Sequence, residues 1–442
     1  MTLRLPSHKK AASFSWSLAA FLLLLSACAG HDKRTADARA ALDQGSPWAA
    51  IDALNKELDV ESADRQPDAL EDDDSLLLLD RAMVLQQVGR YDFSSADLQL
   101  SDKHIEVLDF SRGALDDLGK YMFSDDSGPY QAPAYEKIMI NTANMINYLC
   151  QGNFSGARIE ARRFATMQSF LRNQDPELVA PLALGNTIAG LSFEASGDIA
   201  TALNHYRDAQ QSAEQNQASE WQNAMHSWPQ KGQKAECSSP EGCGTLIAII
   251  GAGRVAAKVS KRIPIGLALT YASSFISPYN RNKAAYLAGQ GLVTWINFPE
   301  MGKAREVTSP PVLYVDGQRS DAPEIANLNA ISRRAWKSAQ GALIASAITR
   351  LITRAAAGEL TRRAVGGVAG ALISLGGQAA LTANDTPDTR SWSTLPAKFY
   401  VARITLPAGE HSVRFTSQGL SDAKKITVNK DSMLVVNFLA LR

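Results

Sequence analysis

The sequence has few of the residues from which enzymes build metal and nucleophilic sites, with 4 cysteines and 6 histidines in 442 residues. It contains neither the His-Glu-x-x-His pair of zinc proteases nor the Gly-x-Ser-x-Gly turn of serine hydrolases. A structural zinc ion takes four protein ligands, yet His226 is the only histidine close to Cys237 and Cys243. We therefore expect no catalytic residues, no metal and no cofactor, and hydrolase activity has no motif in its favour.

The chain also lacks an excess of charge of either sign, because 45 basic residues balance 45 acidic ones. The basic residues are scattered along the sequence rather than gathered in one run. Nucleic-acid-binding proteins instead concentrate lysine and arginine in a patch that faces the phosphates. The composition therefore predicts that nucleic acid is not a partner.

Residues 1–27 have the pattern of a secretory signal peptide. They carry Arg4, Lys9 and Lys10 but no acid, and the uncharged stretch 14–27 is too short to span a bilayer comfortably. The segment ends in Leu-Ser-Ala followed by Cys28, which resembles the lipobox of bacterial lipoproteins.

That resemblance implies a lipid on Cys28, which becomes the first residue of the mature chain, with residues 28–34 as a lipidated tether. Two or three acyl chains on one residue anchor a protein firmly to a membrane. Ala29, rather than Asp, at the next position is the pattern usually sorted to the outer membrane, so we expect anchoring on its periplasmic face. The alternative is an ordinary cleaved signal peptide with an incidental cysteine.

The remaining cysteines fit an oxidising compartment. Cys150 lies in a helical pattern, whereas Cys237 and Cys243 bracket a short loop. We expect a local disulfide between these two, and free thiols are the alternative. The surrounding stretch 216–243 is rich in Gln, Ser, Glu, Lys and Gly and loses the apolar period, so it is predicted to be a linker.

Residues 35–215 are predicted to form helices joined by a recurring turn. Apolar side chains keep a helical period at 76–88, 138–149 and 182–193. In three turns a glycine precedes a large apolar residue and then an alanine: Gly45 with Trp48 and Ala50, Gly152 with Phe154 and Ala157, and Gly197 with Ile199 and Ala202. Gly89 and Tyr91 open a fourth copy, whose Ala96 comes two residues late.

This turn resembles the one between the two helices of a tetratricopeptide (TPR) repeat. The resemblance implies that glycine ends the first helix, that the large apolar residue docks, and that alanine lets the second helix pack closely. The glycines lie 44, 63 and 45 residues apart, so we expect degenerate, TPR-like hairpins with long connections. A generic helical bundle that uses glycine as a stop is the alternative.

Residues 244–442 are predicted to form a β-rich domain. The expected strands are 245–250, 292–298, 312–315, 398–406, 412–416, 425–428 and 433–439. Short strands joined by turns such as that at Asp316 and Gly317 favour a β-sandwich-like domain. The expected fold class is α+β multidomain, with the TPR-like α-helical repeats first and the β part second.

A helical insertion rich in alanine and glycine interrupts the β part at about 325–383. Its segment 364–383 has 20 residues without a charge and contains Gly366-x-x-x-Gly370, a spacing that permits close helix contact in membranes. Its glycines, however, weaken helix formation. We favour a buried or subunit-contacting hairpin, which would support a homo-oligomer, and insertion of 364–383 into a membrane is the alternative.

Gly251, Gly253 and Ala256 have the spacing of a dinucleotide-binding turn. Such a site also needs an acidic residue about twenty positions further on for the ribose, and no acid occurs between Glu241 and Glu300. Pro264 would cut short the helix that should receive the phosphates. We therefore predict a turn or bulge between two strands, with exposed basic residues: Arg254, Lys258, Lys261 and Arg262.

A broader resemblance covers most of the mature chain. The segments 135–140, 147–149, 152–163, 388–396 and 406–411 are similar to a family of uncharacterised bacterial lipoproteins with TPR-like N-terminal halves. Genes of this family often lie near small lipoproteins related to penicillin-binding-protein activators. The family has no settled activity, so the resemblance implies architecture and location only.

These inferences predict a lipid-anchored scaffold lipoprotein that is not an enzyme. Helical repeats offer an extended concave surface, which suits partners such as envelope proteins and other lipoproteins, in an envelope or cell-wall assembly complex. The alternative function is a membrane-inserting subunit of a pore or secretion assembly that uses residues 364–383.

Overall fold

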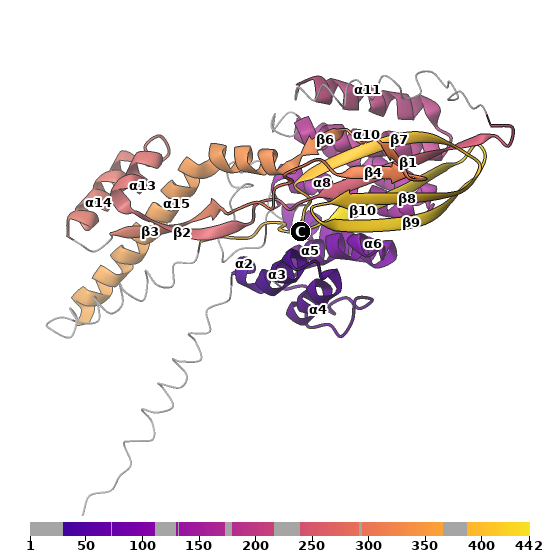
Figure 1. The fold of residues 1–442 in the computed structure, drawn as a ribbon. Coiled ribbons are helices and arrows are strands. Elements are labelled where there is room, and N and C mark those ends of the chain that lie inside the picture. The colour runs from indigo at the N-terminus through magenta and orange to yellow at the C-terminus, as the bar shows by residue number, and fades with distance from the viewer. Residues whose placement is uncertain are drawn as a thin grey trace, which may run out of the picture.

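The computed structural model describes residues 30–71, 73–110, 130, 132–172, 179–215, 239–290, 294–365 and 387–442. Over these ranges the chain is a mixed α+β protein with 12 helices and three sheets (Figure 1), which confirms the α+β class. Among the described helices, none combines the length and the apolar character that a membrane crossing requires.

The N-terminal half consists of helices that pair in sequence order. The helices are α2 (His31–Arg34), α3 (Ala36–Asp43), α4 (Pro47–Glu57), α5 (Asp74–Gln87), α6 (Tyr91–Phe110), α8 (Ala134–Cys150), α9 (Phe154–Arg172), α10 (Val179–Ala195) and α11 (Ile199–Gln215). Hairpins form from α3 with α4, α5 with α6, α8 with α9 and α10 with α11, and each hairpin also contacts the next. The apolar periods at 76–88, 138–149 and 182–193 fall on α5, α8 and α10, as predicted.

The C-terminal half contains two four-stranded sheets and a two-stranded ribbon. The strands are β1 (Cys243–Ala252), β2 (Lys258–Pro264), β3 (Trp295–Met301), β4 (Val312–Val315), β5 (Gln318–Ser320), β6 (Glu324–Asn327), β7 (Lys398–Pro407), β8 (Gly409–Ser417), β9 (Leu420–Val428) and β10 (Met433–Ala440). The sheets have the orders β10-β1-β7-β6 and β5-β4-β8-β9, and β2 pairs with β3. Each of the seven expected strands is present. The strand β2 follows the turn at Gly253 that we expected between two strands, whereas β5 and β6 were not expected.

One face of the first sheet packs against the second sheet. Ile250 on β1 and Phe438 on β10 share an apolar cluster with Val413 and Phe415 on β8. The rings of Phe415 and Phe438 stack with their centroids 5.4 Å apart. This contact excludes water from between the two sheets and holds them as layers.

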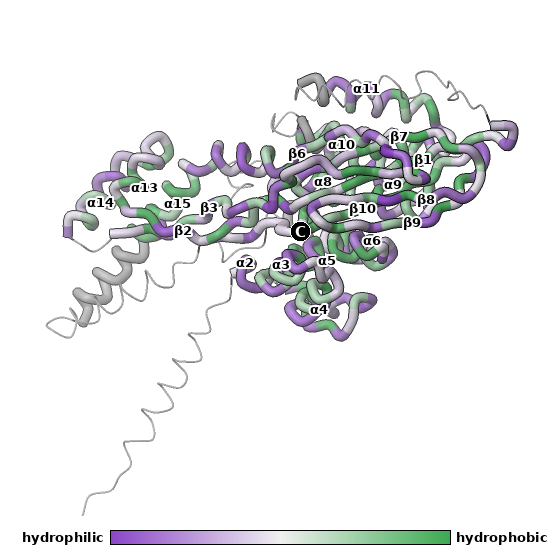
Figure 2. Tube along the Cα trace, in the orientation of Figure 1, coloured by the Kyte–Doolittle hydropathy of each residue, from purple (hydrophilic) through white to green (hydrophobic). Residues whose placement is uncertain are grey.

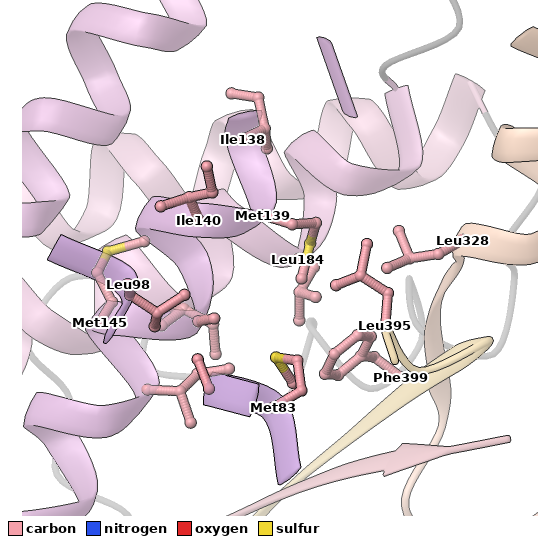
Figure 3. Close-up of a cluster of buried hydrophobic side chains, with 14 of the residues drawn as sticks. Met83, Leu98, Ile138, Met139, Ile140, Met145, Leu184, Leu328, Leu395 and Phe399 are labelled. Atoms are coloured by element: carbon pink, nitrogen blue, oxygen red, sulfur yellow. The ribbon is translucent and has the colours of Figure 1, made fainter. Parts of the chain in front are cut away.

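The other face of the first sheet packs against the helices. Alternate residues of β1, Ile247 and Ile249, belong to the same buried cluster as Met83 on α5 and Leu184 on α10. Figure 3 shows Met83, Leu184 and Phe399 of β7 in this cluster, and Figure 2 shows hydrophobic residues along the central strands and the helices beside them. The helical part and the β part, which we expected as separate domains, therefore share one continuous core.

A second unit with its own core projects from this body (Figure 1). It combines β2, β3, α13 (Ile265–Tyr271), α14 (Pro278–Gly289) and the later part of α15 (Leu328–Val365). The start of α15 lies in the body core, with Leu328 fully buried, whereas Ile344 and Ile348 lie in the core of the projecting unit. We call this unit, residues 258–301 and 336–365, the lobe.

The helical insertion begins later than the expected residue 325. Residues 324–327 form β6, which pairs with β7 through Asn327 and Lys398. Because their backbone is part of the sheet, the helix starts only after them. Residues 366–386 lie outside the described ranges, and so does most of the 364–383 segment. The lobe also includes 258–301, a region that we did not expect to pack with α15.

Candidate functional site at the junction of helices and sheet

The four predicted turn glycines lie in the connections between paired helices. Gly45, Gly89, Gly152 and Gly197 have φ angles of 75°, 77°, 68° and 85°. Residues with a Cβ rarely adopt this left-handed conformation, which explains why glycine ends the first helix of each pair.

The predicted small residue also lies where the paired helices meet. Ala50, Ala157 and Ala202 are buried to 1 % exposure or less. In the fourth turn the equivalent position, five residues after Gly89, is Ser94, which is fully buried and accepts a hydrogen bond from Asn147. Ala96, which the sequence pattern matched to this position, is exposed.

The docking of the large apolar residue is only partly as predicted. Phe154 packs at the edge of the core and Tyr91 is half-buried. Ile199, however, is 40 % exposed and Trp48 is 54 % exposed, so the prediction that they dock is wrong. Both residues lie on the second helix of a hairpin, on a side that no described element covers. The features shared by all four turns are therefore the glycine and the buried small residue.

A segment from the far end of the chain enters the helical part. Residues 388–395 precede β7, and within them Trp392 and Leu395 are fully buried in the core that the helices share with the sheet. This segment was part of the family resemblance, but no pattern in its residues indicated what it contacts. It binds two buried carboxylates, those of Asp80 on α5 and Glu136 on α8.

Asp80 accepts hydrogen bonds from both ends of the chain. Its carboxylate lies 3.0 Å from His31 Nε2, and it accepts from Ser393 Oγ at 3.1 Å and from Thr394 N and Oγ1 at 2.9 Å each. The set contains serine, histidine and aspartate, but the serine donates to the aspartate rather than to the histidine. All three side chains are at most 1 % exposed, so the arrangement is closed to substrate and does not match a hydrolase triad.

Glu136 is the second buried carboxylate. It accepts hydrogen bonds from the hydroxyls of Tyr130 and Tyr135 and from the backbone N–H of Trp392. Burial raises the pKa of Glu136 above its ordinary value, and the hydrogen bond from Tyr130 and the charge of Lys258 oppose this shift. The carboxylate is thus held by donors from the helices and from the 388–395 segment together.

An arginine completes the contact between this segment and the helices. Arg390 is 1 % exposed, and its guanidinium binds Asp388 at 2.9 Å and Asp73 at the start of α5 at 3.2 Å. It also lies over the ring of Tyr130, 5.9 Å from the centroid. Two carboxylates and an aromatic face compensate for the desolvation of the buried cation.

In the turn after β1 and the strand that follows it, two of the four basic residues that we predicted to be exposed are exposed and two are not. Gly253 lies between β1 and β2 with a φ of 67°, as expected for a turn, and Lys261 and Arg262 are exposed. Lys258 is half-buried. Arg254, however, is 3 % exposed, because its guanidinium binds Asp43 and the carbonyl of Arg39 on α3. Burial lowers the pKa of Arg254 to about 10, which still leaves it charged near neutral pH.

The inward side of the hairpins is occupied by the chain itself. Helices α5 and α8 contact β10, α10 contacts β6, and almost every residue of α5 is buried. The concave surface that we expected to receive partners is therefore covered by the first sheet. The second helices of the hairpins, α4, α6, α9 and α11, carry exposed residues and remain as the exposed helical surface.

Several predicted features besides the 364–383 segment fall outside the described part of the chain. These are the signal peptide 1–27, Cys28, Cys237 and the linker up to residue 238, so lipidation and the disulfide with Cys243 stay predictions. Within the described ranges, no cluster of three or more His, Cys, Asp or Glu side chains could hold a metal ion.

Comparison with protein-family models and with curated proteins returns no match for this chain.

Proposed function

We propose that this protein is a lipid-anchored scaffold lipoprotein of the bacterial envelope, held on the periplasmic face of the outer membrane and without catalytic activity. The observation that carries the proposal is the burial of His31, only three residues after Cys28. Three residues span at most about 10 Å. A lipid on Cys28 would thus hold the body directly against the membrane, with no long tether.

The hairpins are proposed to be degenerate TPR-like repeats, and the two four-stranded sheets to be a β-sandwich. The positive-φ glycines, the buried small residue and the contacts between consecutive hairpins support the first assignment. The apolar cluster shared by the two sheets supports the second. Together they would form one rigid platform rather than two domains on a linker.

The partner surface is proposed to lie on the second helices of the hairpins, since the first sheet covers α5, α8 and α10. On α9, Ile159 is 57 % exposed and Phe170 is 60 % exposed. They lie eleven positions apart, or close to three helical turns, and so share one face of the helix. Large apolar side chains that stay exposed on one helix face are typical of protein interfaces. Envelope proteins, including other lipoproteins, are the expected partners.

The test is site-specific photocrosslinking in cells, with the crosslinker placed at Phe170 and, as a matched control, at the exposed Trp48 on α4. We expect Phe170 to give discrete adducts that disappear when Ile159→Ser is added, while Trp48 gives none of them. Adducts that are equal at both positions, or that are insensitive to Ile159→Ser, would contradict a partner site on α9.

Our second proposal is membrane insertion through residues 364–383. The observation that favours it is that α15 extends to Val365, at the start of this segment. Alkaline extraction of a Cys28→Ala variant separates the two proposals. Release into the soluble fraction supports the scaffold, and retention in the membrane supports insertion.

A further inference from the structure

The lobe carries most of the large apolar side chains that the described structure leaves in solvent. Seven of the eleven lie between residues 259 and 295, although the lobe has a well-filled core of its own. Six of them are Leu267, Tyr271, Phe275, Tyr279, Tyr286 and Trp295, with exposures from 43 % to 74 %. This concentration of exposed large apolar side chains in one small unit makes the lobe the candidate binding surface.

The exposed pairs follow the faces of the two short helices. Leu267 and Tyr271 are one turn apart on α13, and Tyr279 and Tyr286 are two turns apart on α14, so each pair shares a helix face. Trp295 begins β3, opposite Pro264 at the end of β2. The tyrosines and the tryptophan combine an apolar ring with a polar atom, the combination enriched where proteins meet the membrane–water interface.

The lobe is also strongly basic, although the whole chain is neutral. Among the lobe residues whose side chains the structure describes, 258–290, 294–301 and 336–352, seven are basic and only one, Glu300, is acidic. Glu300 pairs with Lys261 at 2.6 Å. Lys283 lies over the ring of Tyr286 with its Nζ 5.7 Å from the centroid. This pair places a cation beside an exposed aromatic ring on α14.

The base of the lobe lies beside α2 and α3, the first helices of the described chain. Thr389 donates to Asp32 on α2, and the backbone N–H of Lys258, where β2 begins, donates to Ser391. Arg305, four residues after β3, binds Asp43 at the end of α3. Lys258 and Met301 are partners at one end of the β2–β3 ribbon, so both strands are tied at this end, directly or through residues 389–391, to α2 and α3. A chain that enters the body at Gly30 enters it next to the lobe.

We propose that the lobe binds the surface of a bilayer that contains anionic phospholipid, with its aromatic side chains at the headgroup level and its basic side chains on the lipid phosphates. Basic residues near such a surface each add to the attraction, and aromatic rings at the interface prolong the contact. This contact is peripheral and needs no lipid on Cys28. It goes beyond the proposed scaffold function, because it adds a second point of attachment that would fix the orientation of the body on the membrane.

The test uses the chain from Ala29 to Arg442, which retains every described element and carries no lipid. It is floated with vesicles of phosphatidylcholine plus phosphatidylglycerol, and with vesicles of phosphatidylcholine alone. We expect binding to the anionic vesicles only, and a decrease as salt is raised. The double variant Arg262→Glu with Lys283→Glu should lower the partition coefficient at least about tenfold. The variant Tyr279→Ser with Tyr286→Ser should lower it severalfold.

Matched controls come from the body. Trp48→Ser with Phe170→Ser removes two aromatic rings of similar exposure, and Lys103→Glu with Lys425→Glu reverses two exposed charges. Both controls should bind as the parent chain does, and all variants should keep its thermal midpoint.

Three outcomes would overturn the proposal: no preference for anionic vesicles, equal losses in the lobe and body variants, or full retention of binding after the lobe charges are reversed. Complete competition by soluble heparin, together with normal binding of the tyrosine variant, would identify a general polyanion site instead and equally reject the lipid surface. Since the assay contains neither acylated cysteine nor partner protein, its result is independent of the scaffold proposal.

Discussion

Asp80 is a single side chain that joins three distant parts of the sequence. It receives donors from His31, Ser393 and Thr394, which lie 49, 313 and 314 positions away, and it is fully buried. Removal of a buried acceptor leaves several buried donors unpaired, and it therefore lowers the free energy of unfolding far more than loss of an exposed ion pair does.

We expect Asp80→Ala to lower the free energy of unfolding by about 3–5 kcal/mol. The measurement is urea denaturation followed by circular dichroism. Asp52→Ala removes an exposed carboxylate from α4 and should change the stability by no more than about 0.5 kcal/mol. Equal effects of the two variants would show that the Asp80 contacts contribute little.

Glu136 makes the stability depend on pH in a defined direction. Burial raises its pKa in the folded protein above the ordinary value of 4.5, so the folded state binds this proton more tightly than the unfolded state. Stability then falls as the pH rises from near 4.5 through the raised pKa, because the slope follows the difference in bound protons.

The test compares the wild type with Glu136→Gln, which cannot titrate, at a series of pH values. We expect the unfolding free energy of the wild type, minus that of the variant, to decrease as the pH rises. An increase over the same range would mean that the hydrogen bonds from Tyr130, Tyr135 and Trp392 outweigh burial and lower the pKa of Glu136 instead.

At the scale of elements, residues at equivalent positions of the helical turns differ in burial, although the sequence pattern is the same. Phe154 and Ile199 both stand two positions after a turn glycine, but Phe154 packs on the core and Ile199 is 40 % exposed. We expect Phe154→Asp to destabilise the protein by about 1–3 kcal/mol, and Ile199→Asp to stay within about 0.5 kcal/mol of the wild type. Thermal unfolding of the two variants, side by side, measures the difference. A larger loss for Ile199→Asp would mean that its exposed face is covered in the native protein.

The same turns show what can be predicted from sequence and why. Glycine at positive φ is a local requirement, so Gly45, Gly89, Gly152 and Gly197 could be found from their neighbours alone. The expected strand 433–439 depends on an equally local pattern and is present as β10. The parallel pairing of β10 with β1 is not local, because the partners Thr245 and Met433 are separated by most of the C-terminal half.

The candidate site could not be predicted for the same reason. Arg254 has the sequence surroundings of an exposed residue, and its burial depends on Asp43, which is 211 positions away. Similarly, Asp80 and Glu136 look like ordinary polar positions on helices until residues 388–395 fold against them. The pattern of charge was also misleading, because the basic residues that look scattered in the sequence gather in the lobe only after β2, α14 and α15 pack together.

At the scale of the whole molecule, the shared core makes the helical and β parts depend on each other. The faces of α5, α8 and α10 that meet the first sheet would be exposed in a fragment that contains only the helices. Such a fragment would also leave the carboxylates of Asp80 and Glu136 without their donors from residues 392–394. A protein of independent domains would not show this dependence.

We therefore expect residues 29–215, produced alone, to keep helical far-ultraviolet circular dichroism but to lack a near-ultraviolet signal and a cooperative unfolding transition. The full chain from residue 29 is the reference. Addition of the complementary fragment 239–442 should restore both signals in a one-to-one complex, because the two pieces together contain every contact of the shared core. If the helical fragment unfolds as cooperatively as the full chain, the hairpins are an independent domain, and the sheet is a neighbour rather than half of their core.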